Sequence, residues 1–156
     1  MGVVGVRVRL LGPIEAMVGG EVVDVRGPRQ RRLLAVLALR PATLVDTGEI
    51  LEAVWPDGEL PANPKEALRT YISRLRVALG GAQMLVGRDG GYRLDLPVEA
   101  VDASCFEALL ARSANQRDLG ESQGCVAALD EALALWRGQA LAGSSTKSGL
   151  GPPRCG

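Results

Sequence analysis

The stretch from Asn63 to Leu79 constrains the fold more than any other, because its apolar residues recur at the period of a helix. Four of them share one face: Leu68, Ile72, Leu75 and Leu79. Asn63-Pro64 supplies an N-cap and a first helical turn, and Gly80-Gly81 ends the helix. The sequence therefore predicts a helix over 64–79 that covers a hydrophobic core with one side.

The other side of this helix is basic. It carries Arg69, Thr70, Ser73, Arg74, Arg76 and Val77. Glu66 is the only acid between residues 64 and 79. An α-helix fits the major groove of DNA, and an Arg guanidinium matches a guanine edge or a phosphate. The pattern indicates a DNA-contacting face, with an ordinary solvated face as the alternative.

A glycine-rich hairpin is predicted directly after the helix. Residues 84–86 and 92–94 flank Gly87-Arg88-Asp89-Gly90-Gly91, in which Asp-Gly is a strong turn signal. Arg88 at the tip and Arg93 on the return strand suit a narrow minor groove, where negative potential is concentrated. A solubilising turn is the alternative interpretation.

The chain before this helix predicts a small antiparallel sheet and two helices. Strands are expected over 3–11, 14–18 and 21–25, with Gly19-Gly20 as a hairpin turn. A helix from Pro28 buries Leu33, Leu34 and Leu37 and ends before Pro41. A second, shorter helix runs to Trp55 behind an Asp46–Glu49 capping box.

Two charge clusters stand out in this part of the chain. Arg29, Arg31 and Arg32 begin the first helix, where free amides and cations together form an anion site, unless the side chains splay into water. Residues 44–63 carry five acids and no base: Asp46, Glu49, Glu52, Asp57 and Glu59. This acidic segment is predicted to avoid DNA and to face a protein partner, or simply solvent.

After the hairpin we expect a linker over 95–101, two helices and a flexible tail over 143–156. Asp102 is predicted to cap the first helix, which turns Phe106, Leu109 and Leu110 inward. The second helix aligns Val126, Leu129, Leu133 and Trp136 along one side. The tail is rich in Gly, Ser and Pro and has little to bury.

The composition excludes several classes of site. The chain has no His, so Ser-His and Cys-His nucleophiles and His metal ligands are absent, and no G-x-x-x-x-G-K-[ST] loop occurs. Cys105, Cys125 and Cys155 match no zinc spacing, which indicates a reducing cytoplasm. The longest apolar run, 33–39, is too short to span a membrane. We predict no enzymatic activity, no cofactor and no membrane partner.

Longer motifs carry a family resemblance from about Val6 to Ala142. LRTYISRLRVALG and LVGRDGGYRL resemble the recognition helix and wing of OmpR-like winged-helix domains. LLGPIEAMVGG, VRGPRQRRLLAVLAL, VDASCFEALLA and ALDEALALWRGQALA resemble the Streptomyces antibiotic regulatory protein (SARP) family. The resemblance implies an α+β winged helix-turn-helix over 1–96, followed by a short all-α, tetratricopeptide-like helical pair over 101–142.

The resemblance also implies a function and site residues. Members bind promoter direct repeats as side-by-side copies and recruit RNA polymerase, so a pathway-specific activator, for instance of secondary metabolism, is expected. Arg74 corresponds to the residue that enters the major groove, Ser73 and Arg76 to phosphate contacts, and Arg88 to the minor-groove contact at the wing tip. Tyr92 corresponds to a supporting wing residue, and Trp55 to a phosphate contact. The loop with Asp57 and Glu59 corresponds to the polymerase-facing loop.

This sequence departs from the family pattern in places. Glu66 and Val77 stand where a base would strengthen the grip on DNA. Only about one helical pair precedes the tail, whereas helical repeats need neighbours to bury their faces. The alternative hypothesis is therefore a truncated interaction or decoy module that binds a partner regulator.

Overall fold

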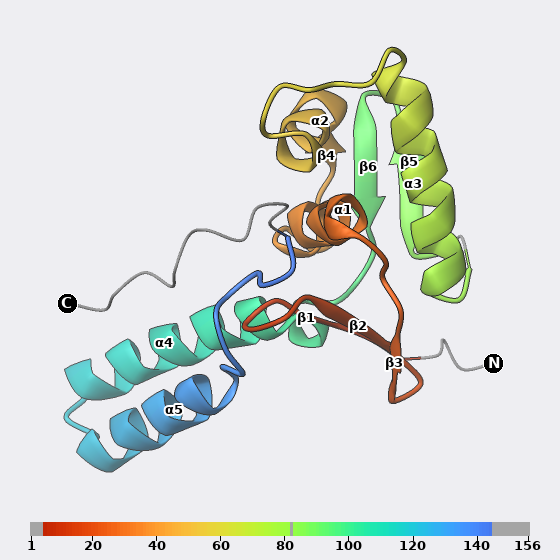
Figure 1. The fold of residues 1–156 in the computed structure, drawn as a ribbon. Helices are drawn as coiled ribbons and strands as arrows, with labels where there is room; N and C mark the ends of the chain where they lie inside the picture. The colour runs from red at the N-terminus through yellow and green to blue at the C-terminus, as the bar shows by residue number, and fades with distance from the viewer. Residues whose placement is uncertain (1–4, 82, 145–156) are drawn as a thin grey trace.

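A computed structural model describes residues 5–81 and 83–144 (Figure 1). The chain opens with an antiparallel sheet of β1 (Val6–Arg9), β2 (Glu15–Val18) and β3 (Glu21–Val23), in that order. Gly19 and Gly20 join β2 to β3 with φ of 62° and 86°, a conformation that favours glycine. The predicted N-terminal sheet is confirmed, although its strands are shorter than the apolar runs.

Three helices follow: α1 (Pro28–Ala38), α2 (Thr47–Val54) and α3 (Pro64–Ala78). A second sheet has the order β4-β6-β5, with β4 (Val45–Asp46), β5 (Leu85–Arg88) and β6 (Gly91–Leu94) all antiparallel to their neighbours. The elements have the predicted order of sheet, three helices and hairpin, which makes an α+β winged helix-turn-helix. The sequence did not predict the short strand β4.

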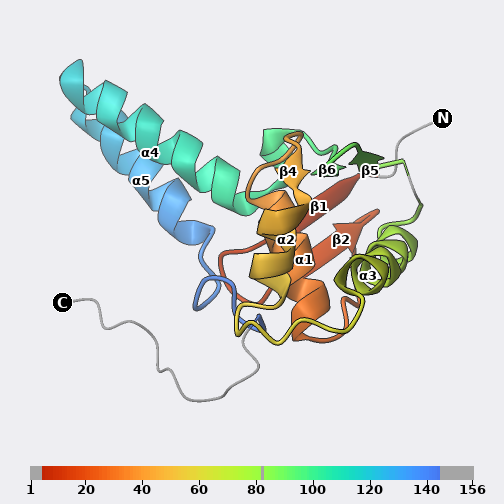
Figure 2. The ribbon, with the colours of Figure 1, turned by 90° about the horizontal axis from the view of Figure 1, so that it is seen from above.

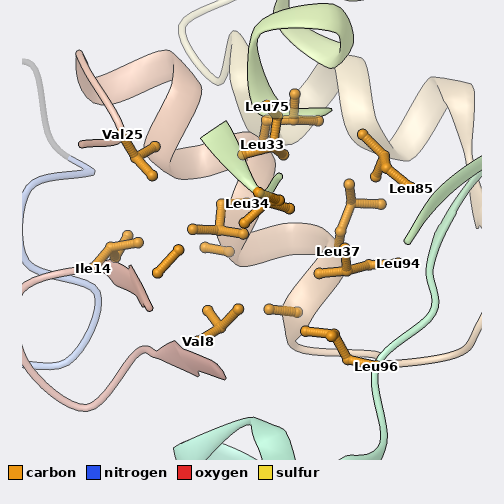
Figure 3. Packing of buried hydrophobic residues seen from close by; sticks show 14 of the residues in the cluster. Val8, Ile14, Val25, Leu33, Leu34, Leu37, Leu75, Leu85, Leu94 and Leu96 are labelled. Carbon is orange, nitrogen blue, oxygen red and sulfur yellow. The ribbon is translucent and has the colours of Figure 1, made fainter. Parts of the chain in front are cut away.

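One hydrophobic core joins both sheets and the three helices (Figure 3). Leu33, Leu34 and Leu37 of α1 are fully buried at its centre, between Val8 of β1 and Leu94 of β6. Burying one such side chain contributes about 1.5–3 kcal/mol, so this leucine face of α1 stabilises the domain substantially.

The ends of the helices agree with the predicted caps in part. The Asp46 carboxylate accepts the Gly48 amide at 2.9 Å, but Glu49 forms an ion pair with Arg40, so the reciprocal capping box is not formed. Asn63 makes no side-chain cap on α3. At the other end of α3, the Gly81 amide donates to Arg76 O at 2.8 Å and the Gly80 amide to Val77 O at 3.2 Å. This pattern is a Schellman cap, and it confirms the predicted end of the helix.

The segment 95–101 is part of the core, not an open linker. It contains a short 3₁₀ helix, η1 (Val98–Ala100), and its Leu96, Ala100 and Val101 belong to the same hydrophobic cluster. Val101 also forms a parallel bridge with Val8. The hydrophobic cluster of the winged helix therefore includes residues of this segment up to the start of the next helix.

The helical pair consists of α4 (Asp102–Asp118) and α5 (Ser122–Ala134), which lie side by side (Figures 1 and 2). Small residues form its buried interface: Ser113, Ala128 and Ala132. Large apolar side chains are exposed instead: Leu110, Leu119, Val126, Leu129, Leu133 and Trp136. The prediction that Leu110 faces inward is wrong, whereas Phe106 and Leu109 are half-buried as part of the same face. The Phe106 ring packs edge-on against Trp136, with ring centres 5.5 Å apart.

Asp102 does not cap α4 as predicted. Its carboxylate reaches the N-terminal sheet, where it accepts the backbone amides of Leu10 at 2.6 Å and Leu11 at 3.1 Å. The base of α4 is therefore fixed to the chain that leaves β1.

The chain after α5 also returns to this sheet. In this return segment, residues 137–142, the Arg137 amide donates to Leu11 O and the Leu141 amide to Leu10 O, both at 2.8 Å. The Arg137 guanidinium donates to Pro13 O at 2.9 Å and lies 3.5 Å from the Glu15 carboxylate. The helical pair is thus attached to the winged-helix domain at both ends.

Most of the predicted tail, residues 145–156, lies outside the described residues. Within the described ranges, no helix combines the length and apolar character needed to cross a bilayer.

Candidate nucleic-acid interface

Helix α3 presents a polar and basic face to solvent. Its exposed side chains are Lys65, Glu66, Arg69, Thr70, Ser73, Arg74 and Val77. Leu68, Ile72 and Leu75 are buried on the opposite side. In Figure 2, α3 lies at the edge of the molecule, on the side away from α4 and α5. The helix therefore has one side in the core and the other free along its length.

The two arginines at the centre of this face have different surroundings. Arg74 is exposed, and its guanidinium lies 5.8 Å from the centre of the Tyr71 ring. Arg76 is half-buried and donates from Nε to the Leu85 carbonyl at 3.1 Å, which ties α3 to the base of the wing. Arg74 is consequently free to reach a ligand with its whole guanidinium, whereas Arg76 has only its terminal nitrogens to offer.

Glu66 contacts two residues in the first half of the exposed face of α3. Its carboxylate lies 3.7 Å from the Arg69 guanidinium, and its carbonyl accepts the Thr70 hydroxyl at 3.3 Å. Both side chains of the ion pair are well exposed, so the pair is weak and a stronger anion can displace it. Arg69 is therefore available for binding at a small cost.

The predicted wing is the hairpin of β5 and β6. Arg88 pairs with Gly91 across the two-residue turn Asp89-Gly90, and Gly90 has φ of 87°. A Cβ at Gly91 would stand 2.1 Å from Val45 O, so only glycine permits β4 to approach β6 here. The exposed Arg88 side chain lies at the end of β5, beside this turn.

Tyr92 and Arg93 point to opposite faces of the wing, because side chains alternate along a strand. Tyr92 packs over Gly87, on the same face as the buried Leu94. Arg93 forms a bidentate ion pair with Asp95, and the hydrogen bond and charge of Asp95 raise the pKa of Arg93. The structure does not bring Arg93 to the face that holds Tyr92 and α3.

Of the three arginines at the start of α1, Arg29 and Arg32 both turn to the end of α2, whereas Arg31 points elsewhere. Arg29 lies 5.8 Å from the centre of the Trp55 ring, Arg31 donates to Gly143 O at 3.4 Å, and Arg32 donates to Val54 O at 3.2 Å. Successive helical residues point about 100° apart, so neighbours in sequence need not share a surface. The structure therefore does not bring all three arginines of the predicted anion site together, because Arg31 lies apart from Arg29 and Arg32.

Trp55 is a core residue in this structure. It is only 4% exposed and packs between Arg29 and Tyr71, with its ring centre 5.8 Å from that of Tyr71. Trp55 therefore supports α3 from behind, and its contact with a phosphate stays a prediction.

A cleft of about 470 Å³ separates the start of α3 from the wing. Lys65 and Arg69 line it on the helix side, Arg88 and Tyr92 on the wing side, and Thr47 of α2 closes one end. We call this space the α3–wing cleft. Sequence reasoning missed Lys65, although its four-residue spacing from Arg69 places both on one helical face. It also did not foresee that Asp46 and Thr47, from the acidic segment, would line this cleft.

The loop between α2 and α3 forms a separate surface. Asp57 and Glu59 are exposed there, next to a shallow pocket of about 330 Å³ lined by Leu51, Trp55 and Leu60. This acidic and apolar surface contrasts with the basic face of α3.

Comparisons with known proteins match both halves of the chain. Residues 21–94 match the family described as transcriptional regulatory protein, C terminal, and residues 101–155 match the bacterial transcriptional activator domain. The chain is 35% identical over 136 residues to the regulatory protein AfsR of Streptomyces griseus, and 31% identical over 145 residues to the regulatory protein DnrI of Streptomyces peucetius. The chain belongs to the SARP family of regulators.

A solved structure of this family supports the fold. The Mycobacterium tuberculosis protein EmbR, in complex with a low affinity phosphopeptide, aligns with a TM-score of 0.82 at 28% identity. The alignment covers 88% of this chain and 38% of that one. Among the sequence relatives, the matched region is 87% of this chain but 14% of AfsR, and 86% of this chain but 53% of DnrI. The SARP chain described here thus spans only part of the length of these relatives.

Proposed function

We propose that this SARP chain is a transcription regulator that binds double-stranded promoter DNA through α3 and the wing. The observation that carries the proposal is the free basic face of α3 beside a hairpin with an exposed Arg88. A helix of this width fits the major groove, and a slim hairpin next to it suits the adjacent minor groove. The proposed activity is binding, with no chemical step.

Within this interface the residues have different proposed roles. Arg74 reads a base edge, because its guanidinium is exposed and makes no ion pair among the described residues. Arg69, Thr70 and Ser73 contact the backbone or neighbouring bases, Arg76 contributes its terminal nitrogens to a phosphate, and Arg88 enters the minor groove beside Tyr92. Arg31, Arg32 and Arg93 are not proposed as DNA contacts, because each is engaged by a hydrogen bond within the chain.

The proposed partners are inferred from the family and from the exposed loop between α2 and α3. We propose that copies of the chain bind tandem direct repeats side by side, and that Asp57 and Glu59 face RNA polymerase from the exposed loop. Regulation of a pathway of secondary metabolism and a cytoplasmic location belong to the same proposal.

DNA binding is tested by selecting duplexes from a randomised pool with the purified chain. Affinity for a selected duplex and a scrambled duplex is then measured by fluorescence anisotropy across a salt series. The proposal predicts a linear fall of log affinity with log salt on both duplexes and tighter binding to the selected one. A folded chain that binds neither duplex at low salt would overturn it.

Arg74→Ala tests the base-reading role. Loss of a bidentate contact is expected to cost about 1–3 kcal/mol on the selected duplex and to relax preference at one base position. The measurement is anisotropy on duplexes varied one base pair at a time, with the exposed Arg117→Ala as a matched control. Unchanged preference in Arg74→Ala would remove Arg74 from the site.

A second candidate function is an interaction module that binds a partner regulator through the helical pair. The observation that favours it is the exposure of large apolar residues on α5, with Leu133 65% and Val126 56% exposed. This function predicts a complex with the partner regulator that persists at high salt, because salt does not screen apolar contacts. Light scattering at low and high salt distinguishes this complex from a DNA-dependent assembly.

A further inference from the structure

We propose that the α3–wing cleft holds one phosphodiester group of the DNA backbone, and that Lys65 is the main cation that binds it. This inference rests on the proposed DNA-binding function and names the part of the DNA that enters the cleft. Lys65 was not among the residues that the sequence pattern indicated.

The position of the cleft follows from the geometry of the two grooves. Adjacent major and minor grooves of a duplex are separated by one sugar–phosphate strand. If α3 occupies the major groove and the turn at Asp89-Gly90 enters the minor groove, that strand crosses the space between them. The space of about 470 Å³ between Lys65 and Arg88 is this crossing point.

The charges that line the cleft favour an anion. Three cations face it: Lys65, Arg69 and Arg88. Arg69 is paired with Glu66 at 3.7 Å, whereas no ion pair within the described part of the chain engages Lys65. One carboxylate, that of Asp46, also lines the cleft and accepts the Gly48 amide, so the lining carries three cations and one anion. Lys65 is thus the cation with the fewest competing partners.

The turn of the wing allows the sugar–phosphate backbone of DNA to approach closely. Gly87, Gly90 and Gly91 line this side of the cleft. The space beside Gly90 is open, whereas the Tyr92 ring lies beside Gly87 and the Val45 carbonyl beside Gly91. The hydrophobic floor comes from Leu51 and Leu68, which cannot compete for the anion. A phosphate in this space meets cations on both the helix wall and the wing wall.

A phosphate contact differs from a base contact in its consequences. Phosphates carry no sequence information, so Lys65 contributes equally to binding of every duplex. Each neutralised phosphate also adds about 0.9 to the slope of log affinity against log salt. These two properties separate the role proposed for Lys65 from that of Arg74.

The test uses the full chain with Lys65→Ala and the control Arg117→Ala, on the selected and scrambled duplexes. Lys65→Ala is expected to weaken both duplexes by the same factor and to lower the salt slope by about 0.9, while Arg117→Ala matches the parent. A scan of duplexes with one neutral methylphosphonate each then locates the phosphate. At that position the parent loses affinity and Lys65→Ala loses no more.

The outcomes separate this inference from the proposed function. A parent chain that binds no duplex overturns both. A parent that binds, with Lys65→Ala equal to Arg117→Ala in slope and affinity, overturns only the role of Lys65. Loss of preference between the two duplexes in Lys65→Ala would also overturn it, because that result belongs to a base contact.

Discussion

In the winged-helix domain the large apolar side chains lie inside, whereas in α4 and α5 the small residues lie inside. Leu33, Leu34 and Leu37 are fully buried, but the contact between α4 and α5 is made by Ser113, Ala128 and Ala132. Two helices alone cannot enclose large side chains, since each has only one neighbour to pack against. The winged-helix domain thus closes its own core, and the helical pair depends on attachment to that domain.

Leu37→Ala should show the largest effect, because it opens a cavity in the closed core. Loss of a fully buried leucine is expected to cost about 2–5 kcal/mol in free energy of unfolding. Leu133→Ala, at an exposed position of α5, should change it by less than about 0.5 kcal/mol. Denaturant unfolding of both variants measures the contrast, and equal losses would contradict the difference in burial.

Asp102→Asn should weaken the attachment of the helical pair. A charged acceptor of two amides is replaced by a neutral one, at an expected cost of about 1.5–3 kcal/mol. Hydrogen exchange should become faster at Leu10, Leu11 and the first turn of α4 and stay unchanged in α3. The exposed Asp118→Asn is the matched control, and faster exchange throughout the chain would argue against a local attachment.

Ala128→Leu tests the close contact between α4 and α5. A large residue in the fully buried contact between α4 and α5 should destabilise the pair by about 1–3 kcal/mol, although leucine is a good helix former. The neighbouring Ala127→Leu, at an exposed position, should have little effect. Calorimetry of the two variants decides, and a stabilised Ala128→Leu would mean that the helices do not approach closely.

Much of the winged-helix domain was predictable from sequence, because its signals are local and periodic. The leucine pattern of α3, the glycines that end it and the Asp-Gly turn of the wing each specify one element. The strand β4 was not predictable, because two residues carry no period. Its pairing depends on the close approach of Gly91 to Val45, a contact between distant parts of the chain.

The candidate site was less predictable than the fold. Sequence order placed Arg29, Arg31 and Arg32 together, but helical geometry turns Arg31 away from the other two, which both reach the end of α2. Leu110 of α4 was predicted to face inward but is exposed, because periodicity shows that residues share a face without showing whether that face is covered. Charge and period identify candidates, and only the tertiary arrangement decides which of them meet.

The attachment of α4 and α5 at both ends has a consequence for how this chain tolerates change in length. On one side the amides of Leu10 and Leu11 donate to Asp102, and on the other side amides of the return segment donate to the carbonyls of the same two residues. Residues inserted at the far turn, near Gly120, leave every one of these bonds in register. Residues inserted in 137–142 shift all of the return pairings at once. Length variation in such a chain is therefore expected at the tip of the hairpin, and the segment beside the sheet is expected to keep its length.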